Sequence, residues 1–203
     1  MNRKHVVAVL ALAGLCFASL NWVQAQVPAA TGIPRPGVVG GQFAPSLFYV
    51  KVKGKKTGDF KGDSMRAGHV GAIEGIKFAY QMTTPVDVAT GMPTGRRQYS
   101  AITFTKPWSP ASPEFIQSWS TNEPLTNVTF EFITVGLDGK EVPYQTITLT
   151  NATVSAIKRH MGVSMGTEPP DPRELEDISF SFQTIEVYDA AAKTTATDSW
   201  LGK

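Results

Sequence analysis

The sequence predicts a mainly β protein, a two-sheet antiparallel β-barrel or sandwich capped by one short α-helix. Apolar and polar residues alternate along most of residues 46–189, as half-buried strands require. The pair Asp138-Gly139 is a strong hairpin signal between two such alternating segments. One stretch, which begins at Ser112-Pro113, instead has apolar residues at helical spacing.

Each alternating segment is expected to form one strand. In chain order these segments are Leu47–Lys53, Ile73–Met82, Arg97–Lys106, a segment through Val128, Phe130 and Phe132, the segment Val142–Ile157, and a last segment from Ile178 to Val187. A Lys- and Gly-rich loop up to Gly71 and a Pro- and Gly-rich turn region at 83–95 separate the first three. We expect the long segment Val142–Ile157 to be bent.

The last expected strand changes phase along its length. Phe180 and Phe182 share one face. Ile185 and Val187 fall on the opposite face. A slip of one residue is typical of a β-bulge, in which two residues of one strand face a single residue of its partner. We therefore predict a bulge near Gln183–Thr184.

The single helix has recognisable start and stop signals. Ser112 is a suitable N-cap, and Pro113 suits the first helical position because the N–H it lacks would have no partner there. The helix should end near Asn122, since Pro124 follows. One apolar face should cover the sheets, and it consists of Phe115, Ile116 and Trp119.

Residues 1–25 have the composition of a secretory signal peptide. Two basic residues precede the apolar run Val6–Leu20, and Val23 and Ala25 stand at the −3 and −1 positions of a cleavage site. An uncleaved membrane anchor is the alternative, although a membrane span needs roughly 20 apolar residues. After cleavage of residues 1–25, here called the leader, we expect no association with a membrane. We expect the protein to be secreted, or periplasmic if the leader is used for export.

Two further segments flank the predicted domain at 46–189. Residues 26–45 are rich in Pro, Gly and Ala and show no hydrophobic period, so we expect a mobile linker. Residues 190–203 form a short, mostly polar tail in which Trp200 is the candidate anchor. The sequence leaves three alternatives for this tail: it docks on the domain, docks on a neighbouring subunit, or is loose.

Charge and cysteine usage exclude several classes of function. The chain has 19 basic and 17 acidic residues, and removal of Arg3 and Lys4 with the leader leaves it formally neutral. No basic stripe is present, so we expect no nucleic-acid partner. The single cysteine, Cys16, lies in the leader. The mature chain therefore has no disulfide, thiolate metal site or cysteine nucleophile.

Two patterns raise the question of catalysis or metal binding. Residues 162–166 read G-V-S-M-G, which fits a hydrolase nucleophile elbow, and His69 and His160 are candidate bases. The elbow needs a helix directly after it, and the prolines that follow prevent one. We interpret this segment as a loop and both histidines as solvated loop residues rather than metal ligands. We predict no catalytic residue, no metal ligand and no cofactor.

Several segments match a known family in order and in spacing. They are G-R-R-Q at Gly95–Gln98, I-T-F-T-K at Ile102–Lys106, the pair Ser112-Pro113, I-T-L-T-N-A-T-V-S-A-I at Ile147–Ile157, and L-E-D-I-S-F-S-F-Q-T-I-E at Leu175–Glu186. With these segments the chain resembles Hcp, the haemolysin-coregulated tube protein of bacterial type VI secretion systems. The resemblance covers residues 46–189.

The resemblance implies a structural and transport role without catalysis. Hcp proteins are two-sheet β-barrels with one helix that assemble into hexameric rings. The rings stack into a tube that a contractile sheath drives outward behind a VgrG-type spike, and they can carry small effectors. On family grounds, the expected subunit or lumen contacts are Arg96, Arg97, Lys106, Ser112 and Pro113.

The leader supports an alternative function. Type VI substrates leave directly from the cytoplasm and need no signal peptide. The alternative is therefore an exported Hcp-like binding or adhesion module that acts in the periplasm or outside the cell, without a contractile machine.

Overall fold

The computed structural model describes residues 38–39, 42–43, 47–136, 140–161 and 174–200. The predicted signal peptide and most of the predicted linker lie outside the described residues. Within that linker, β1 (Val38–Val39) and β2 (Gln42–Phe43) form a short antiparallel pair. No helix among the described residues combines the length and apolar character needed to cross a membrane.

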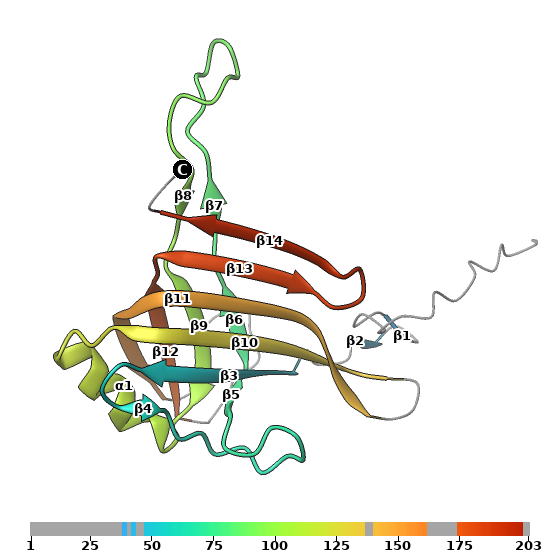
Figure 1. The fold of residues 1–203 in the computed structure, drawn as a ribbon, viewed down its shortest axis with the longest axis vertical. Coiled ribbons are helices and arrows are strands. Elements are labelled where there is room, and N and C mark those ends of the chain that lie inside the picture. Colours follow the sequence, from blue (N-terminus) through green and yellow to red (C-terminus); the bar gives the residue numbers. More distant parts are fainter. Residues whose placement is uncertain (1–37, 40–41, 44–46, 137–139, 162–173, 201–203) are drawn as a thin grey trace, which may run out of the picture. The chain divides into compact units, whose positions relative to one another are not determined.

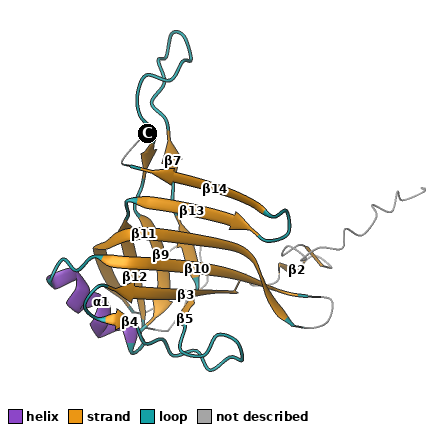
Figure 2. Cartoon of the chain, viewed as in Figure 1, coloured by secondary structure: helices purple, strands orange, loops and turns teal. Residues whose placement is uncertain are grey.

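The domain that follows is mainly β, with the single helix α1 in its described part (Figures 1 and 2). Its elements are β3 (Leu47–Gly54), β4 (Gly58–Asp59), β5 (Ile73–Gly75), β6 (Lys77–Ala79), β7 (Met82–Thr83), β8 (Gln98–Tyr99), β9 (Ile102–Pro107), α1 (Ala111–Ser120), β10 (Leu125–Val135), β11 (Glu141–His160), β12 (Leu175–Ser181), β13 (Thr184–Asp189) and β14 (Thr194–Ser199).

The strands form two layers that share β11 (Figure 1). The path of pairing is β4-β3-β10-β11-β12-β9-β6, with β5 beside β3, and β13 and β14 continuing outward from β11. The first part of β11 pairs with β10 and β13, and its last part pairs with β12. All these pairs are antiparallel. The predicted two-sheet antiparallel fold with one short helix is confirmed.

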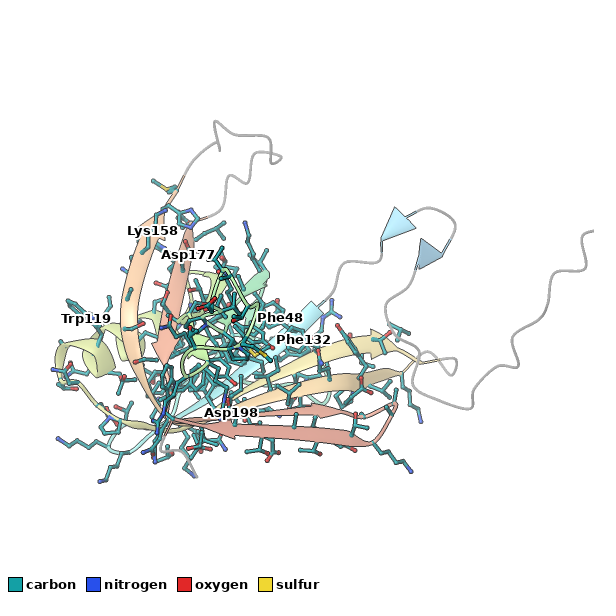
Figure 3. All side chains as sticks on the ribbon, turned by 90° about the horizontal axis from the view of Figure 1, so that it is seen from above. Phe48, Trp119, Phe132, Lys158, Asp177 and Asp198 are labelled. Atoms are coloured by element: carbon teal, nitrogen blue, oxygen red, sulfur yellow. The ribbon has the colours of Figure 1, made fainter. Side chains whose placement is uncertain are left out.

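Phenylalanine side chains from both layers fill the core. Phe104 of β9 stacks on Phe180 of β12 with ring centroids 5.8 Å apart, and Phe130 of β10 meets Phe104 edge-on at 5.7 Å. All three are fully buried. Phe48 and Phe132, labelled in Figure 3, lie in the same dense cluster, with ring centroids 5.3 Å apart. The alternation predicted along β10 therefore marks core side chains.

The long strand β11 turns a corner between the layers at Asn151. Asn151 has a φ of 51°, in the left-handed region that Asn adopts more readily than most residues. Before it, Ile147 and Leu149 are buried. After it, Ala152 and Val154 are buried, so the buried face of the strand changes at the corner. The predicted bend in this strand is confirmed.

The predicted bulge near Gln183–Thr184 is wrong. The segment breaks there into β12 and β13, and both strands pair with β11. On one side of the break Thr150 lies opposite Thr184. On the other side Thr153 lies opposite Ser181 in the same register, so no residue is inserted. The phase changes because β12 and β13 turn the same corner as β11, and the register shift of this ladder lies instead in the last part of β11.

The predicted second strand, Ile73–Met82, is also wrong as a single element. It divides into β5, β6 and β7, which pair with β3, β9 and β8 respectively. Gly75 marks the crossing between layers, because a Cβ atom there would overlap the ring of Phe48. The next residue, Ile76, already donates its N–H to β9 at 2.8 Å. In the same way Arg97–Lys106 divides into β8 and β9.

The helix starts slightly earlier than predicted. Pro110, rather than Ser112, stands at the N-cap position of α1. Pro113 therefore lies within the first turn, where a missing N–H leaves no helical hydrogen bond unmade. The last helical residue is Ser120, close to the predicted end at Asn122.

The predicted inner face of the helix is only partly correct. Phe115 is fully buried, but Ile116 is 40% exposed and Trp119 is 52% exposed. Trp119 lies on the outer side of the helix (Figure 3). The buried face is instead made of Ala111, Ser112, Phe115 and Ser118. Small residues beside Phe115 allow the helix to lie close to the sheets.

Two further predicted features lie at the ends of strands. The turn at Asp138-Gly139 lies outside the described residues, but β10 and β11 on either side pair as a hairpin, with Val135 opposite Glu141. In the predicted tail, β14 pairs with β13 along its whole length. Of the three alternatives for the tail, docking on the domain is the one found.

Candidate assembly and binding surfaces

Lys106 and Ser112, two of the predicted contact residues, lie inside the protomer. The Nζ atom of Lys106 is 2.8 Å from Glu176 Oε1, and the Ser112 hydroxyl donates to the same oxygen at 2.6 Å. Lys106 also donates to Pro107 O and Ser109 Oγ, both at 2.8 Å. Burial lowers the pKa of Lys106, while the hydrogen bond and charge of Glu176 oppose this effect. This cluster ties α1 to β9 and β12.

Arg159 connects the buried cluster to the surface. Its Nε atom donates to Glu176 Oε2 at 3.0 Å, and its guanidinium lies over the ring of Trp108 at 4.9 Å. The indole N–H of Trp108 donates to Leu175 O at 3.1 Å. Both oxygens of Glu176 thus have cationic partners, as a buried carboxylate requires.

The predicted contact residues therefore separate into two groups. Lys106 and Ser112 are 0% and 4% exposed, so they position the helix and offer almost no surface to another subunit. Pro113, Arg96 and Arg97 are exposed. For these three, a role in subunit contacts stays a prediction.

The segment 82–99, here called the arm, projects from the sheets as a hairpin (Figure 1). β7 and β8 pair at its base, and Val86 pairs with Pro93 further out. At its tip, Asp87 Oδ1 accepts the N–H groups of Ala89 and Thr90 at 2.7 and 2.9 Å. The arm therefore has a defined conformation held by its own hydrogen bonds.

The arm exposes apolar side chains. The exposed fractions are 59% for Met82, 55% for Val86, 101% for Val88 and 67% for Met92. Asp87 is the only charged residue between Gln81 and Gly95. A projecting apolar segment of this kind is typical of a surface that becomes covered in an assembly.

Beside the base of the arm, polar groups converge on Asp198 of β14. The guanidinium of Arg97 forms a bidentate ion pair with its carboxylate, and the Tyr99 hydroxyl donates to the same group. The N–H of Ser199 also donates to Asp198 Oδ1 at 2.8 Å. This cluster fastens the arm to the C-terminal strand. No sequence pattern singled out Asp198, because its role depends on β14 lying against the arm.

A cleft of about 870 Å³ opens at this cluster. Its lining residues are Arg96, Arg97, Tyr99, Thr197, Asp198, Ser199 and Trp200. Trp200 is 46% exposed, and its ring meets Tyr99 edge-on at 5.9 Å. Both predicted arginines thus line the cleft, together with the predicted anchor Trp200.

The two histidines lie in unrelated surroundings. His69 stacks on Tyr49 at 4.1 Å, with Nδ1 3.5 Å from Glu131 Oε2. His160 Nε2 lies 3.4 Å from Asp177 Oδ2 at the end of β11. The interpretation of His69 as a solvated residue is wrong, because its side chain is only 11% exposed and stacks on the buried ring of Tyr49.

The other candidate chemistry has no described counterpart. The G-V-S-M-G pattern at 162–166 lies outside the described residues. Within the described ranges, no group of three or more His, Cys, Asp or Glu side chains is arranged to hold a metal ion.

Comparisons with known proteins agree with this architecture. A family model described as "Type VI secretion system effector, Hcp" matches residues 49–188. The Major exported protein of Pseudomonas aeruginosa is 26% identical to this chain over 161 residues, which cover 75% of this chain and 94% of that protein.

Solved Hcp structures share the fold. One crystal structure of an Hcp protein has a TM-score of 0.70 at 23% identity and covers 76% of this chain and 98% of its own. The Hcp1 protein of the E. coli EAEC 042 pathovar has a TM-score of 0.68 at 24% identity, covering 77% and 99%. Hcp3 of Pseudomonas aeruginosa has a TM-score of 0.60 at 21% identity, covering 76% and 98%. The strand β14 lies beyond the residues that the family model matches.

Proposed function

The chain belongs to the Hcp family of type VI secretion proteins, and from this premise we propose that it is a tube subunit whose copies form stacked hexameric rings. The observation that carries the proposal is the family match over residues 49–188, which spans both layers of the fold and α1. Hcp proteins are structural tube components, so the proposed role involves no chemical reaction.

The arm supports assembly on physical grounds. Its exposed Val88 and Met92 would each contribute roughly 1.5–3 kcal/mol if fully buried against another subunit. Because its own hydrogen bonds order the arm, little conformational entropy is lost on contact. We propose that the arm forms one of the contacts between subunits.

The proposed partners follow from the family role. They are other copies of this chain, a VgrG-type spike, a contractile sheath and small effectors carried by the rings. Such a tube protein leaves the cell together with the spike, and a relative named Major exported protein is in keeping with secretion.

Native mass spectrometry of the purified chain tests the ring. We expect a species of six subunits, and a population of monomers alone would contradict the proposal. Replacement of both Val88 and Met92 by Ser should lower the association constant of this contact at least about a hundredfold, and with it the amount of assembled protein. Met65→Ser is the matched control, because Met65 is 89% exposed but lies in another loop.

A secretion assay tests whether release of the protein depends on a contractile sheath. Deletion of the contractile sheath in the source organism should abolish release of the protein into the medium. Unchanged release without the sheath would contradict the tube role.

The leader favours a second candidate function. The signal-like residues 1–25 fit an exported Hcp-like binding or adhesion module that acts in the periplasm or outside the cell. N-terminal sequencing of the secreted protein separates the two functions. A mature chain that begins near Gln26 supports this second function, whereas an intact Met1 supports direct passage through the tube machine.

A further inference from the structure

The last strand, β14, has an unpaired edge. It pairs with β13 along its whole length and with no other described strand. Alternate residues of an edge strand direct their N–H and C=O groups outward, where another strand can bind them. Thr194 to Thr197 are exposed, so no described residue covers this edge. The strand is therefore a ready template for one more strand.

The edge leads directly into the cleft beside Asp198. The C-terminal residues of β14, Thr197 to Ser199, belong to the lining of the cleft, and Trp200 follows them. Figure 3 shows Asp198 on this hairpin, well away from Lys158 at the end of β11. A strand added along β14 would therefore end with alternate side chains in the cleft.

The cleft carries one positive charge that is not neutralised. Arg97 and Tyr99 both bind the carboxylate of Asp198, so the charge of Arg97 is balanced. Among the described residues, Arg96 forms no hydrogen bond or ion pair. A free guanidinium in a concave surface favours a carboxylate, which it binds with paired hydrogen bonds.

Trp200 supplies an apolar wall beside this charge. Its backbone N–H donates to Gln183 O at 2.9 Å, and its ring packs on Tyr99. Roughly half of the side chain remains exposed. A fixed, half-exposed indole is suited to contact with an aromatic or aliphatic side chain.

We propose that β14 and the cleft together bind an extended acidic peptide segment of another protein. The segment adds as a strand along the free edge of β14. Its carboxylate binds Arg96, and the apolar side chain two residues further along, on the same face of the strand, packs on Trp200. All these residues belong to one protomer, so the site does not depend on ring formation.

Charge disfavours a second copy of this chain as the occupant. Antiparallel pairing of two β14 strands would bring Lys193 of one copy towards Arg96 of the other. Among the described strands, β4 also lies at an edge of the sheet, and the exposed Lys61 follows it. Like charges placed opposite each other weaken strand pairing, whereas an acidic segment complements Arg96.

Binding of a labelled hexapeptide, Thr-Val-Thr-Glu-Val-Phe, in which Glu and Phe share one face of a strand, to the full chain tests the site by fluorescence anisotropy. We expect saturable binding that Arg96→Ala weakens about tenfold, because a charge-assisted pair is lost. Lys158→Ala is the matched control, since Lys158 is an exposed cation outside the cleft, and it should leave the affinity unchanged. The same peptide with Gln in place of Glu should bind about as weakly to the wild type as the original binds to Arg96→Ala.

Two N-methylated peptides test whether the segment binds as a strand. Alternate N–H groups of a strand face its partner, so methyl groups on one alternate set block pairing with β14 and those on the other set do not. We expect one methylated peptide to bind and the other to fail. Equal binding of both would overturn the strand arrangement, and equal affinity for the Glu and Gln peptides would overturn the role of Arg96.

The occupant is tested on the same samples. If the affinity for the peptide falls as the protein concentration is raised, a second copy of the chain covers the edge of β14. That result would overturn the proposal. Displacement of the peptide by ATP would overturn it too, because the cleft would then be a nucleotide site. Native mass spectra of the same samples separate this proposal from the proposal of a ring. If sixfold species are intact but the peptide does not bind, only the peptide-binding proposal is refuted.

Discussion

The ammonium group of Lys106 lies 2.8 Å from the carboxylate of Glu176, and both side chains are completely buried. Burial of either charge alone would be costly, and the pair is stable because other groups complete it. Ser112 donates to one oxygen of Glu176, and Arg159 donates to the other. The family motif residue Lys106 therefore acts by joining α1 to the sheets.

Removal of one partner of this pair should destabilise the fold strongly. In Lys106→Met, Glu176 keeps Ser112 and Arg159 but loses its buried cation, which costs about 3–5 kcal/mol of the free energy of unfolding. The double variant Lys106→Met with Glu176→Leu should recover part of that loss, because it also removes the buried carboxylate, which in Lys106→Met has only the partly exposed Arg159 as a cationic partner. Urea denaturation of the three proteins measures both effects.

Lys53→Met is the matched control for this experiment. Lys53 lies 3.9 Å from Asp59 at the surface, with 61% of its side chain exposed, so its removal should change the free energy of unfolding by less than about 1 kcal/mol. Equal losses for Lys106→Met and Lys53→Met would show that the buried pair has no special role.

Glu123 should make the stability depend on acid. Burial raises the pKa of its carboxyl group, but hydrogen bonds from the Thr57 N–H and hydroxyl and from the Lys56 N–H together lower it below the usual value of 4.5. A carboxyl group whose pKa is lower in the folded state stabilises the fold above its unfolded pKa. That contribution is lost as the pH falls from about 4.5 through the folded pKa.

Glu123→Gln tests this prediction. Loss of the charge-assisted bonds to Lys56 and Thr57 should cost about 1–3 kcal/mol at pH 7, measured by urea denaturation. The wild type and the variant should approach each other in stability as the pH falls below 4.5. A constant difference between them down to pH 2.5 would contradict the prediction.

The sequence was informative where burial alone decides the structure. The alternation of Val128, Phe130 and Phe132 predicted a core strand correctly, because every second side chain of a strand faces one layer. It was less informative where the chain passes between layers. At Gly75 the corner depends on close packing against Phe48, and at Asn151 it depends on a left-handed backbone conformation. A periodicity of two residues encodes neither feature.

The candidate site was predictable only in part. Arg96 and Arg97 were named from the family motif, and Trp200 from its isolation in a polar tail. The cluster on Asp198 was missed, because Tyr99 and Asp198 are 99 positions apart and meet only after β14 pairs with β13. The β-branched residues Thr194, Thr195 and Thr197 were the one available signal for that strand.

Asn151 should tolerate glycine but no β-branched residue. Its φ of 51° costs a residue with a branched Cβ about 1–2 kcal/mol, whereas glycine adopts this conformation without strain. We expect Asn151→Val to lower the midpoint of thermal unfolding clearly. Asn151→Gly should stay near the wild type, apart from the loss of a hydrogen bond to Gln183. Equal effects of the two variants would show that the backbone conformation is not limiting.

The helix offers a final test, because two aromatic residues on it have opposite surroundings. Phe115 is fully buried and contacts the rings of Phe60, Phe104 and Phe180. Phe115→Ala should therefore cost about 3–5 kcal/mol of the free energy of unfolding. Trp119 is 52% exposed, and Trp119→Ser should change that free energy by about 0.5 kcal/mol or less. Urea denaturation decides between the two faces: a loss in Trp119→Ser as large as that in Phe115→Ala would mean that Trp119 belongs to the core, as the helical spacing first predicted.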